Sequence, residues 1–244
     1  MTDIIIEPSL LSKEEKLSGP CLFCLTPYEA GILKRAFPPD HCTSQFLFNS
    51  NLYRINDSSG PFYWAGPAIG APMAVMSMEK LIARGISRFI AVGWCGSLMD
   101  NVRATELVLP SWGLSEEGVS SHYLGGRISR LPGPFKKKVA DLLSREGFPV
   151  HHGPVWTTDA LYRESWTQAR RYSTQGIVAV DMEFTALARL AAFRGVDLAV
   201  VLIVSDEIRG GASEASFKGK VFKKTSKSLI ESLVEGLRKD ELLA

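Results

Sequence analysis

Residues 88–98 read Arg88-Phe-Ile-Ala-Val-Gly93-Trp-Cys-Gly-Ser-Leu98, an apolar run that ends in small residues. A short apolar run bounded by glycine is typical of a buried strand, so we predict a strand over 88–93 that runs into a turn. The preceding residues 71–84 carry apolar side chains at helical spacing, and Gly85 stands where a helix ends. A helix followed by a buried strand is the repeating unit of α/β proteins.

The same unit occurs twice more along the chain. A helical pattern closed by glycine precedes an apolar run at residues 135–155 and again at 182–204. The other expected elements are a strand at 21–25, a helix at 28–37, paired strands at 45–55 and 62–65 around a turn at 57–60, and a terminal amphipathic helix at 220–237. This alternation predicts an α/β fold: a single three-layer domain with a mixed central β-sheet flanked by helices. We expect this domain to span residues 1–244, with residues 1–19 as an N-terminal extension.

The composition excludes several classes of protein. The 244 residues are 45% hydrophobic and 22% charged, which is ordinary for a globular protein and excludes a disordered or fibrous chain. The formal net charge of +2 gives no electrostatic basis for binding nucleic acid or an acidic membrane surface. No apolar run approaches the roughly 20 residues of a membrane span. No basic segment precedes Ile4-Ile-Ile6, so we expect no signal peptide, no membrane partner and a cytoplasmic location.

Four cysteines are too few for a disulfide scaffold in a chain of this length. Cys21 and Cys24 have the spacing of a redox or zinc motif, but in a strand this spacing puts them on opposite faces. The pairs His41-Cys42 and His151-His152 do not complete a set of metal ligands. We therefore expect reduced thiols, no metal and no cofactor.

Ligands of open α/β sheets bind beyond the carboxyl ends of the strands. In this chain those ends are followed by four segments: 25–29, 93–97, 155–159 and 205–208. Neither these segments nor Gly66-Pro-Ala-Ile-Gly70 carry a complete dinucleotide-binding or P-loop motif, and no G-x-S-x-G is present. The candidates for chemistry are therefore the polar residues at these ends.

Two acidic clusters lie at such positions. Asp206 follows the most apolar strand of the chain, where partial desolvation raises a carboxyl pKa and suits it to general acid catalysis. The alternative is that Ser205 and Asp206 cap a helix. Glu183 begins the helix 182–194 and either grips a sugar diol or, with Asp181, serves the positive end of that helix. Each segment alone leaves both alternatives open.

Four motifs, taken in order, resemble a known family. They are Ala65-Gly-Pro-Ala-Ile-Gly-Ala-Pro72, Ala91-Val-Gly-Trp-Cys-Gly-Ser-Leu98, Val180-Asp-Met-Glu183 and Val204-Ser-Asp206. Together they resemble the trimeric and hexameric nucleoside phosphorylase superfamily, which includes purine nucleoside and uridine phosphorylases and the methylthioadenosine/S-adenosylhomocysteine nucleosidases. The similarity spans most of residues 20–238.

The resemblance implies a role for each matching residue. Asp206 is expected to protonate the leaving base, Glu183 to hold the ribose 2′ and 3′ hydroxyls, and Met182 to pack against sugar and base. Trp156 falls where the family places an aromatic side chain beside the base, the alternative being a core aromatic. The same motifs place three more residues at the substrate: Gly93, Trp94 and Ser205. The reaction implied is cleavage of an N-ribosidic bond, in which an acid neutralises the departing base and a carboxylate lies near the cationic sugar.

The sequence departs from the phosphorylases at both arginines that cradle phosphate. Their Gly-Asp-Pro-x-Arg loop reads Leu25-Thr-Pro-Tyr-Glu29 here, with glutamate at the arginine position. Ala91 stands at the second arginine position, and Trp94 replaces a small hydroxyl residue. The nucleosidase branch uses water and places a glutamate on the first loop, so Glu29 is the candidate catalytic base.

Three functions stay open. The first choice is hydrolysis of a nucleoside, with purine favoured because Asp206 needs a ring nitrogen to protonate. The second is phosphorolysis with phosphate as co-substrate, in which Arg54 or Arg209 rebuilds the phosphate site; Arg54 is alternatively a plain strand-edge residue. The third is a non-catalytic homologue that binds a nucleoside, suggested by the bulk of Trp94. The resemblance also implies a homo-oligomer, either a dimer or a hexamer.

Overall fold

The central strand of the computed structural model is β5 (Arg88–Ser97), the apolar run quoted above. It pairs in parallel with β1 (Cys21–Cys24) on one side and with β10 (Asp197–Arg209) on the other. Its successive side chains lie in two separate apolar cores, Phe89 in the first and Ile90 in the second, as expected for a strand covered on both faces. The structure describes residues 4–38, 42–48, 50–57, 60–123, 125–131, 133–209, 212–239 and 241–242.

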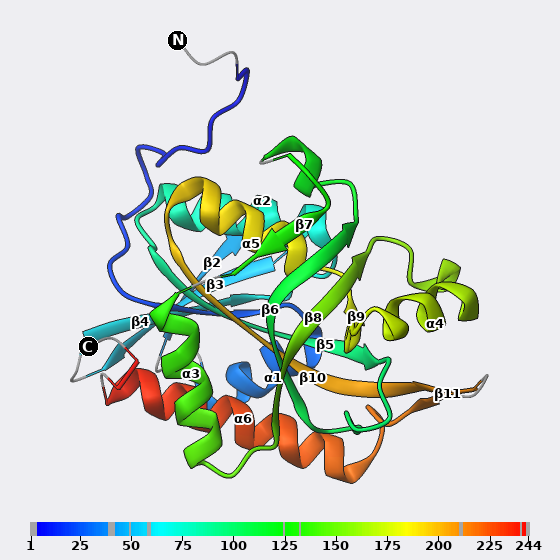
Figure 1. Cartoon of the computed structure of the whole chain (residues 1–244). Helices are drawn as coiled ribbons and strands as arrows, with labels where there is room; N and C mark the ends of the chain where they lie inside the picture. Colours follow the sequence, from blue (N-terminus) through cyan, green and yellow to red (C-terminus); the bar gives the residue numbers. More distant parts are fainter. Residues whose placement is uncertain are drawn as a thin grey trace.

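The strands form one mixed sheet. The remaining strands are β2 (Cys42–Leu47), β3 (Ser50–Asp57), β4 (Gly60–Gly66), β6 (Leu107–Glu116), β7 (Ile128–Arg130), β8 (Val150–Thr158), β9 (Ala179–Asp181) and β11 (Ala212–Ala215). Their order is β11-β10-β6-β8-β9-β5-β1-β4-β3-β2, with β7 paired to β6. Because β10 also pairs with β5, the strands β5, β10, β6, β8 and β9 close a ring, and β1, β4, β3 and β2 extend from it as an open arm (Figure 1).

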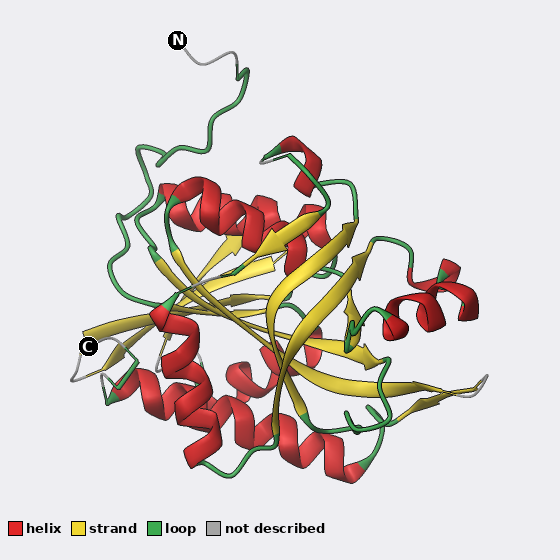
Figure 2. Cartoon of the chain, viewed as in Figure 1, coloured by secondary structure: helices red, strands yellow, loops and turns green. Residues whose placement is uncertain are grey.

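Helices cover both faces of this sheet (Figure 2). The helices α2 (Ala71–Ala83) and α5 (Phe184–Arg194) pack into the first core. The helices α1 (Pro27–Ala36), α3 (Pro134–Arg145) and α6 (Lys220–Arg238) pack into the second. A last helix, α4 (Trp166–Thr174), lies to one side of the sheet over a small core of its own (Figure 1). The predicted α/β fold, with a mixed sheet between layers of helices, is confirmed.

Several boundaries differ from the prediction. Residues 45–55 form two strands, β2 and β3, because the chain reverses between Leu47 and Ser50 and the two strands pair antiparallel. The small residues 93–97, expected as a turn, continue β5 as strand because β10 pairs with them as far as Glu207. Of the turn predicted at 57–60, Ser58 and Ser59 lie outside the described residues. In the described part of the chain, no helix is both long enough and apolar enough to cross a membrane.

Candidate active site

A cavity of about 330 Å³ lies where β1, β5 and β10 end, the place that the sheet topology predicts for a ligand. Five of the eight predicted site residues line it: Trp94, Met182, Glu183, Ser205 and Asp206. Four of its lining side chains carry a carboxyl group, and none of those that the structure describes there is a lysine or arginine. The wall is therefore acidic.

Asp206 enters this cavity from a bulge in β10. The pairing of β10 with β5 shifts register between Val204 and Asp206, so Ser205 is an extra residue in the strand. Such bulges redirect the side chains that follow them. The Ser205 hydroxyl lies 2.6 Å from Asp206 Oδ1. Gly96 makes room for the carboxyl group, because a Cβ atom there would lie 3.0 Å from Asp206 Oδ2. The alternative that these residues cap a helix is wrong, since β10 continues to Arg209.

Glu183 is fixed between the first residues of two helices. It immediately precedes α5, and its Oε1 atom accepts a hydrogen bond of 2.5 Å from the amide of Gly70, which immediately precedes α2. Gly70 has φ +82°, a conformation that favours glycine. Burial, together with the charge of Asp181, raises the pKa of Glu183 to about 8. Burial and the charge of Asp181 therefore oppose ionisation of this carboxyl group near neutral pH.

Asp181 accepts hydrogen bonds from amides at the start of α5, which is one of the two interpretations given above for this segment. Its Oδ2 atom accepts hydrogen bonds from the amides of Glu183 (3.0 Å) and Phe184 (2.6 Å). Its Oδ1 atom accepts a hydrogen bond of 2.6 Å from the hydroxyl of Thr157. Burial raises the pKa of Asp181 to about 6 despite these bonds. Asp181 thus holds the chain that presents Met182 and Glu183 to the cavity.

Glu29 lies behind the cavity wall and does not line the cavity. The side chain is fully buried, and burial raises its pKa. Its Oε1 atom accepts hydrogen bonds from Trp94 Nε1 (3.0 Å) and from the hydroxyl of Ser226 on α6. Its Oε2 atom accepts one from the hydroxyl of Thr26. Thr26 and Trp94 both line the cavity, so Glu29 reaches it through their polar hydrogens. The candidate base Glu29 is therefore not among the residues that line the cavity.

Two other predicted residues also lie outside the cavity. Trp156 is 1% exposed and packs against Tyr172 of α4, with ring centroids 5.0 Å apart. It is the core aromatic of the two alternatives, because its position in β8 turns the indole toward α4. Gly93 packs behind the wall, where a Cβ atom would lie 2.8 Å from Leu25 Cδ1. Its role is close packing between strands.

Trp94 forms part of the wall and does not fill the space. Its ring stacks on Phe217 at 5.5 Å and meets Phe222 edge-on at 5.1 Å. These contacts hold the indole toward α6, which leaves the cavity of about 330 Å³ open.

Three lining residues lie outside all the segments and motifs singled out from the sequence: Leu161, Glu164 and Phe217. Leu161 begins the 3₁₀ turn Leu161–Arg163 that follows β8, and Glu164 comes directly after it, a few residues beyond the segment 155–159 singled out from the sequence. Burial, and then the charge of Asp206, raise the pKa of Glu164 to about 7. Phe217 follows β11, and no sequence pattern marks it.

Neither of the two arginines considered for a phosphate site, Arg54 and Arg209, is among the described residues that line the cavity. Arg54, on β3, pairs with Glu15 at 3.0 Å and with Asn56, away from the cavity. Arg209 is the last residue of β10, and its side chain lies outside the described part of the structure.

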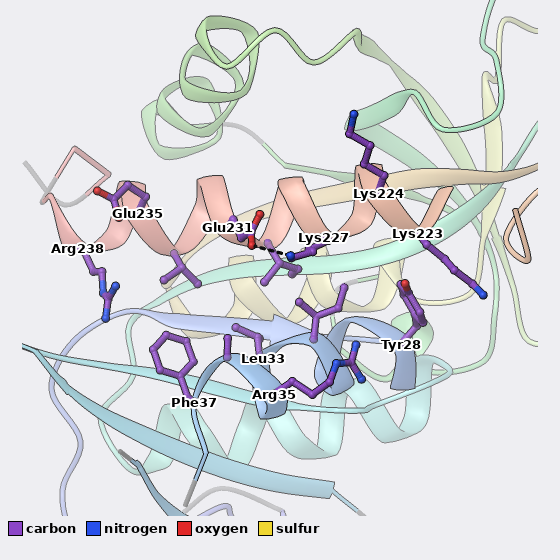
Figure 3. Close-up of a pocket in the computed structure, with 14 residues that line it drawn as sticks. Tyr28, Leu33, Arg35, Phe37, Lys223, Lys224, Lys227, Glu231, Glu235 and Arg238 are labelled. Atoms are coloured by element: carbon purple, nitrogen blue, oxygen red, sulfur yellow. Dashed lines mark ion pairs between the residues drawn. The ribbon is translucent and has the colours of Figure 1, made fainter. Parts of the chain in front are cut away.

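Cations gather instead in a separate groove of about 880 Å³ between α1 and α6 (Figure 3). Its cationic side chains are Arg35, Lys223, Lys224, Lys227 and Arg238. Its floor is apolar, and Lys227 pairs with Glu231 across one turn of α6. Tyr28 lines this groove and also packs against Trp94, so the two hollows lie on either side of these rings.

The cysteines give no metal site. Cys21 lies in the first core and Cys24 in the second, so the two thiols face opposite sides of the sheet, as predicted. Burial raises the pKa of both thiols. Within the described ranges, no three His, Cys, Asp or Glu side chains are grouped to hold a metal ion.

Comparison with known proteins agrees with the geometry. Residues 21–235 match the family model described as "Phosphorylase superfamily". A DeoD-type purine nucleoside phosphorylase of Bacillus cereus is 31% identical over 154 residues, which are 62% of this chain and 66% of that protein, slightly less than two thirds of its length.

Solved structures share the fold. The purine nucleoside phosphorylase of Toxoplasma gondii, in complex with immucillin-H, has a TM-score of 0.81 at 16% identity and covers 99% of this chain and 98% of its own. The 5′-methylthioadenosine/S-adenosyl homocysteine nucleosidase of Campylobacter jejuni has a TM-score of 0.77 at 12% identity, over 91% of this chain and 99% of its own. The family match covers nearly the whole described sheet and the cavity, and it shows that the chain belongs to the phosphorylase superfamily.

Proposed function

We propose that this protein hydrolyses the N-ribosidic bond of a purine nucleoside. The observation that carries the choice of water is the acidic wall, with four carboxyl groups and no described lysine or arginine. A phosphate dianion in such a cavity would lose its hydration without the Arg or Lys side chains that normally compensate its charge. Water and a neutral nucleoside meet no such penalty.

Asp206 is the proposed general acid. As the bond between C1′ and the base breaks, its electron pair moves to the base, and Asp206 gives its proton to a ring nitrogen. The carboxyl group lines the cavity beside the Ser205 hydroxyl, and the bulge in β10 aims it there. Neutralising a leaving group in this way contributes about 10²–10⁴-fold to a rate.

Glu183 and Met182 are the proposed sugar site. Glu183 is held by the Gly70 amide, and its carboxylate would accept the ribose hydroxyls while favouring the positive charge that develops at C1′. Met182 offers an adaptable apolar surface beside it. Both residues belong to the same short segment ahead of α5, so their positions relative to one another are fixed.

Glu29 is the proposed proton acceptor for the attacking water, acting through Thr26. Thr26 lines the cavity, and its hydroxyl donates a hydrogen bond to Glu29 Oε2. A water held by Thr26 would pass one proton to that hydroxyl as Thr26 passes its own to Glu29, and the hydroxide would add to C1′. Burial raises the pKa of Glu29, which strengthens it as a base.

The relay predicts opposite results for two substitutions of Thr26. Thr26→Val removes the hydroxyl at nearly constant volume and is expected to lower kcat by about 10²-fold, the lower range for one proton-transfer step. Thr26→Ser keeps the hydroxyl and should retain most of kcat. Steady-state rates of base release measure both. Equal rates for the two variants would remove Thr26 from the mechanism.

Hydrolysis predicts that phosphate is not consumed. We expect a panel of purine nucleosides to yield free base and ribose at the same rate in phosphate-free buffer and in buffer with added phosphate. Chromatography of the sugar product gives the answer directly, because phosphorolysis yields ribose 1-phosphate. Strict dependence on phosphate would overturn the hydrolytic proposal and leave the acid and sugar roles standing.

Phosphorolysis is the second candidate, supported by the name of the relative that is 31% identical. It needs a cation at the cavity, and Arg209 is the nearest one in the chain beyond Asp206 and Ile208. The same product assay separates the two reactions.

A further inference from the structure

A second cavity, of about 390 Å³, adjoins the first at Asp206. The two share five wall residues: Leu161, Glu164, Asp206, Ile208 and Phe217. The residues of the sugar end, Met182 and Glu183, line only the first cavity. The second cavity therefore opens from the end that holds the acid, where the base would lie.

The second cavity has an apolar and aromatic character. Beyond the shared residues it is lined by Tyr162, Ser165, Trp166 and Ala169, from the segment that leads into α4. Tyr162 is 95% exposed and Trp166 is 41% exposed. Exposed aromatic side chains around a hollow mark a site that binds apolar groups. None of its described lining residues is a lysine or arginine, and two are acidic, so the occupant is neutral or cationic.

We propose that the second cavity is a subsite for an apolar or aromatic substituent on the base. This inference rests on the proposed function, because that function places the base at Asp206. The preferred substrates are then purine nucleosides whose base is extended on the side away from the ribose. The first cavity alone, about 330 Å³, is at the lower end for ligand sites, and the extension supplies the additional room.

Glu164 lies where the two cavities meet and supplies the polar contact of the subsite. A substituent attached through an exocyclic amine carries one N–H group, and a carboxylate at this junction can accept its hydrogen bond. An ether or alkyl link offers no such donor. The chemistry therefore favours substituted amines, with the apolar group beyond them against Trp166 and Tyr162.

The test compares adenosine with N6-benzyladenosine. Trp166→Ala removes one wall of the subsite at an exposed position at the start of α4, and Tyr162→Ala removes a second at an almost fully exposed position. We expect each variant to lower kcat/KM for N6-benzyladenosine by about 10-fold and to leave kcat/KM for adenosine within about 2-fold, as losses of apolar pocket contacts do. Phe46→Ala, another exposed aromatic, lines neither cavity and is the matched control.

Two results would overturn the subsite. One is a wild-type protein that cleaves adenosine but rejects N6-benzyladenosine. The other is an unchanged ratio of the two kcat/KM values in both variants. If the wild type cleaves neither nucleoside, the proposed function fails, and the subsite is then tested by measuring the binding of N6-benzyladenine and adenine. Tighter binding of N6-benzyladenine, abolished by Trp166→Ala, would support the subsite. Equal binding of the two bases would refute it.

Discussion

Asp206→Asn should slow base release from a purine nucleoside by about 10³-fold, within the range for loss of a general acid. Asparagine keeps the size of the side chain and an acceptor for the Ser205 hydroxyl, which lies 2.6 Å from Asp206 Oδ1. It has no proton to give, so the base would have to leave as an anion. Initial rates of base release measure the effect, and the Kd of the nucleoside should change little.

A second substrate makes this test specific to proton transfer. A riboside whose leaving group is nitrophenolate departs without protonation, so Asp206→Asn should cleave it at nearly the wild-type rate. Glu207→Gln is the matched control, because the Glu207 carboxylate accepts a hydrogen bond of 2.7 Å from the Ala104 amide, a structural contact. An Asn variant that retains a tenth of the rate on the purine nucleoside would show that Asp206 is not the acid.

Glu183→Gln should make the protein more stable and less active. Burial and Asp181 raise the pKa of Glu183 to about 8 in the folded protein, above the ordinary value of 4.5. Between these two values the folded state holds a proton that the unfolded state has lost, so this carboxyl group lowers the free energy of unfolding as pH rises from about 4.5 to 8. Glutamine does not ionise, and the variant escapes this loss.

The test measures Tm at two pH values and, separately, kcat/KM. The excess in Tm of Glu183→Gln over wild type should be small at pH 5 and several degrees at pH 8.5, given about 2–4 °C for each kcal/mol in a chain of this size. At pH 8.5, where Glu183 is ionised, the same variant should lose about 10–100-fold in kcat/KM, since a charged acceptor is replaced by a neutral one. Glu231→Gln, an exposed partner of Lys227, should change neither quantity appreciably. A Tm difference that does not grow with pH would refute the assigned ionisation.

The fold could be predicted from the sequence where the local patterns are strong. The apolar run in β5 and the helix before it were predicted because burial on both faces and a closing glycine leave a clear signal. β6 was not predicted, since Pro110 and Gly113 interrupt it, and the structure accommodates them with a register shift against β8. α4 was not predicted although its capping box, Ser165 with Gln168, is present in the sequence.

The site was predictable where a residue directly follows a strand. Asp206 follows the apolar part of β10, Glu183 lies two residues after β9, and both line the cavity. Glu29 was given the wrong position because its direction is set by Ser226, which is 197 residues away in the chain. For Trp156 the sequence left two alternatives open, because its burial depends on Tyr172 of α4, which the pattern did not reveal. Glu164 lines the cavity because of the path that the loop after β8 takes, and no periodic sequence pattern predicts that path.

The contact between Glu29 and Ser226 has a consequence for how the enzyme is made. Ser226 and Phe222 belong to the last helix, and they hold Glu29 and Trp94 in place. When β10 has left the ribosome, the proposed acid Asp206 and the proposed sugar ligand Glu183 have been made, but the helix that supports Glu29 and Trp94 has not. The proposed site is therefore complete only after α6 has been made, and a chain clipped ahead of α6 keeps the proposed reactive groups without the side chains that support Glu29 and Trp94.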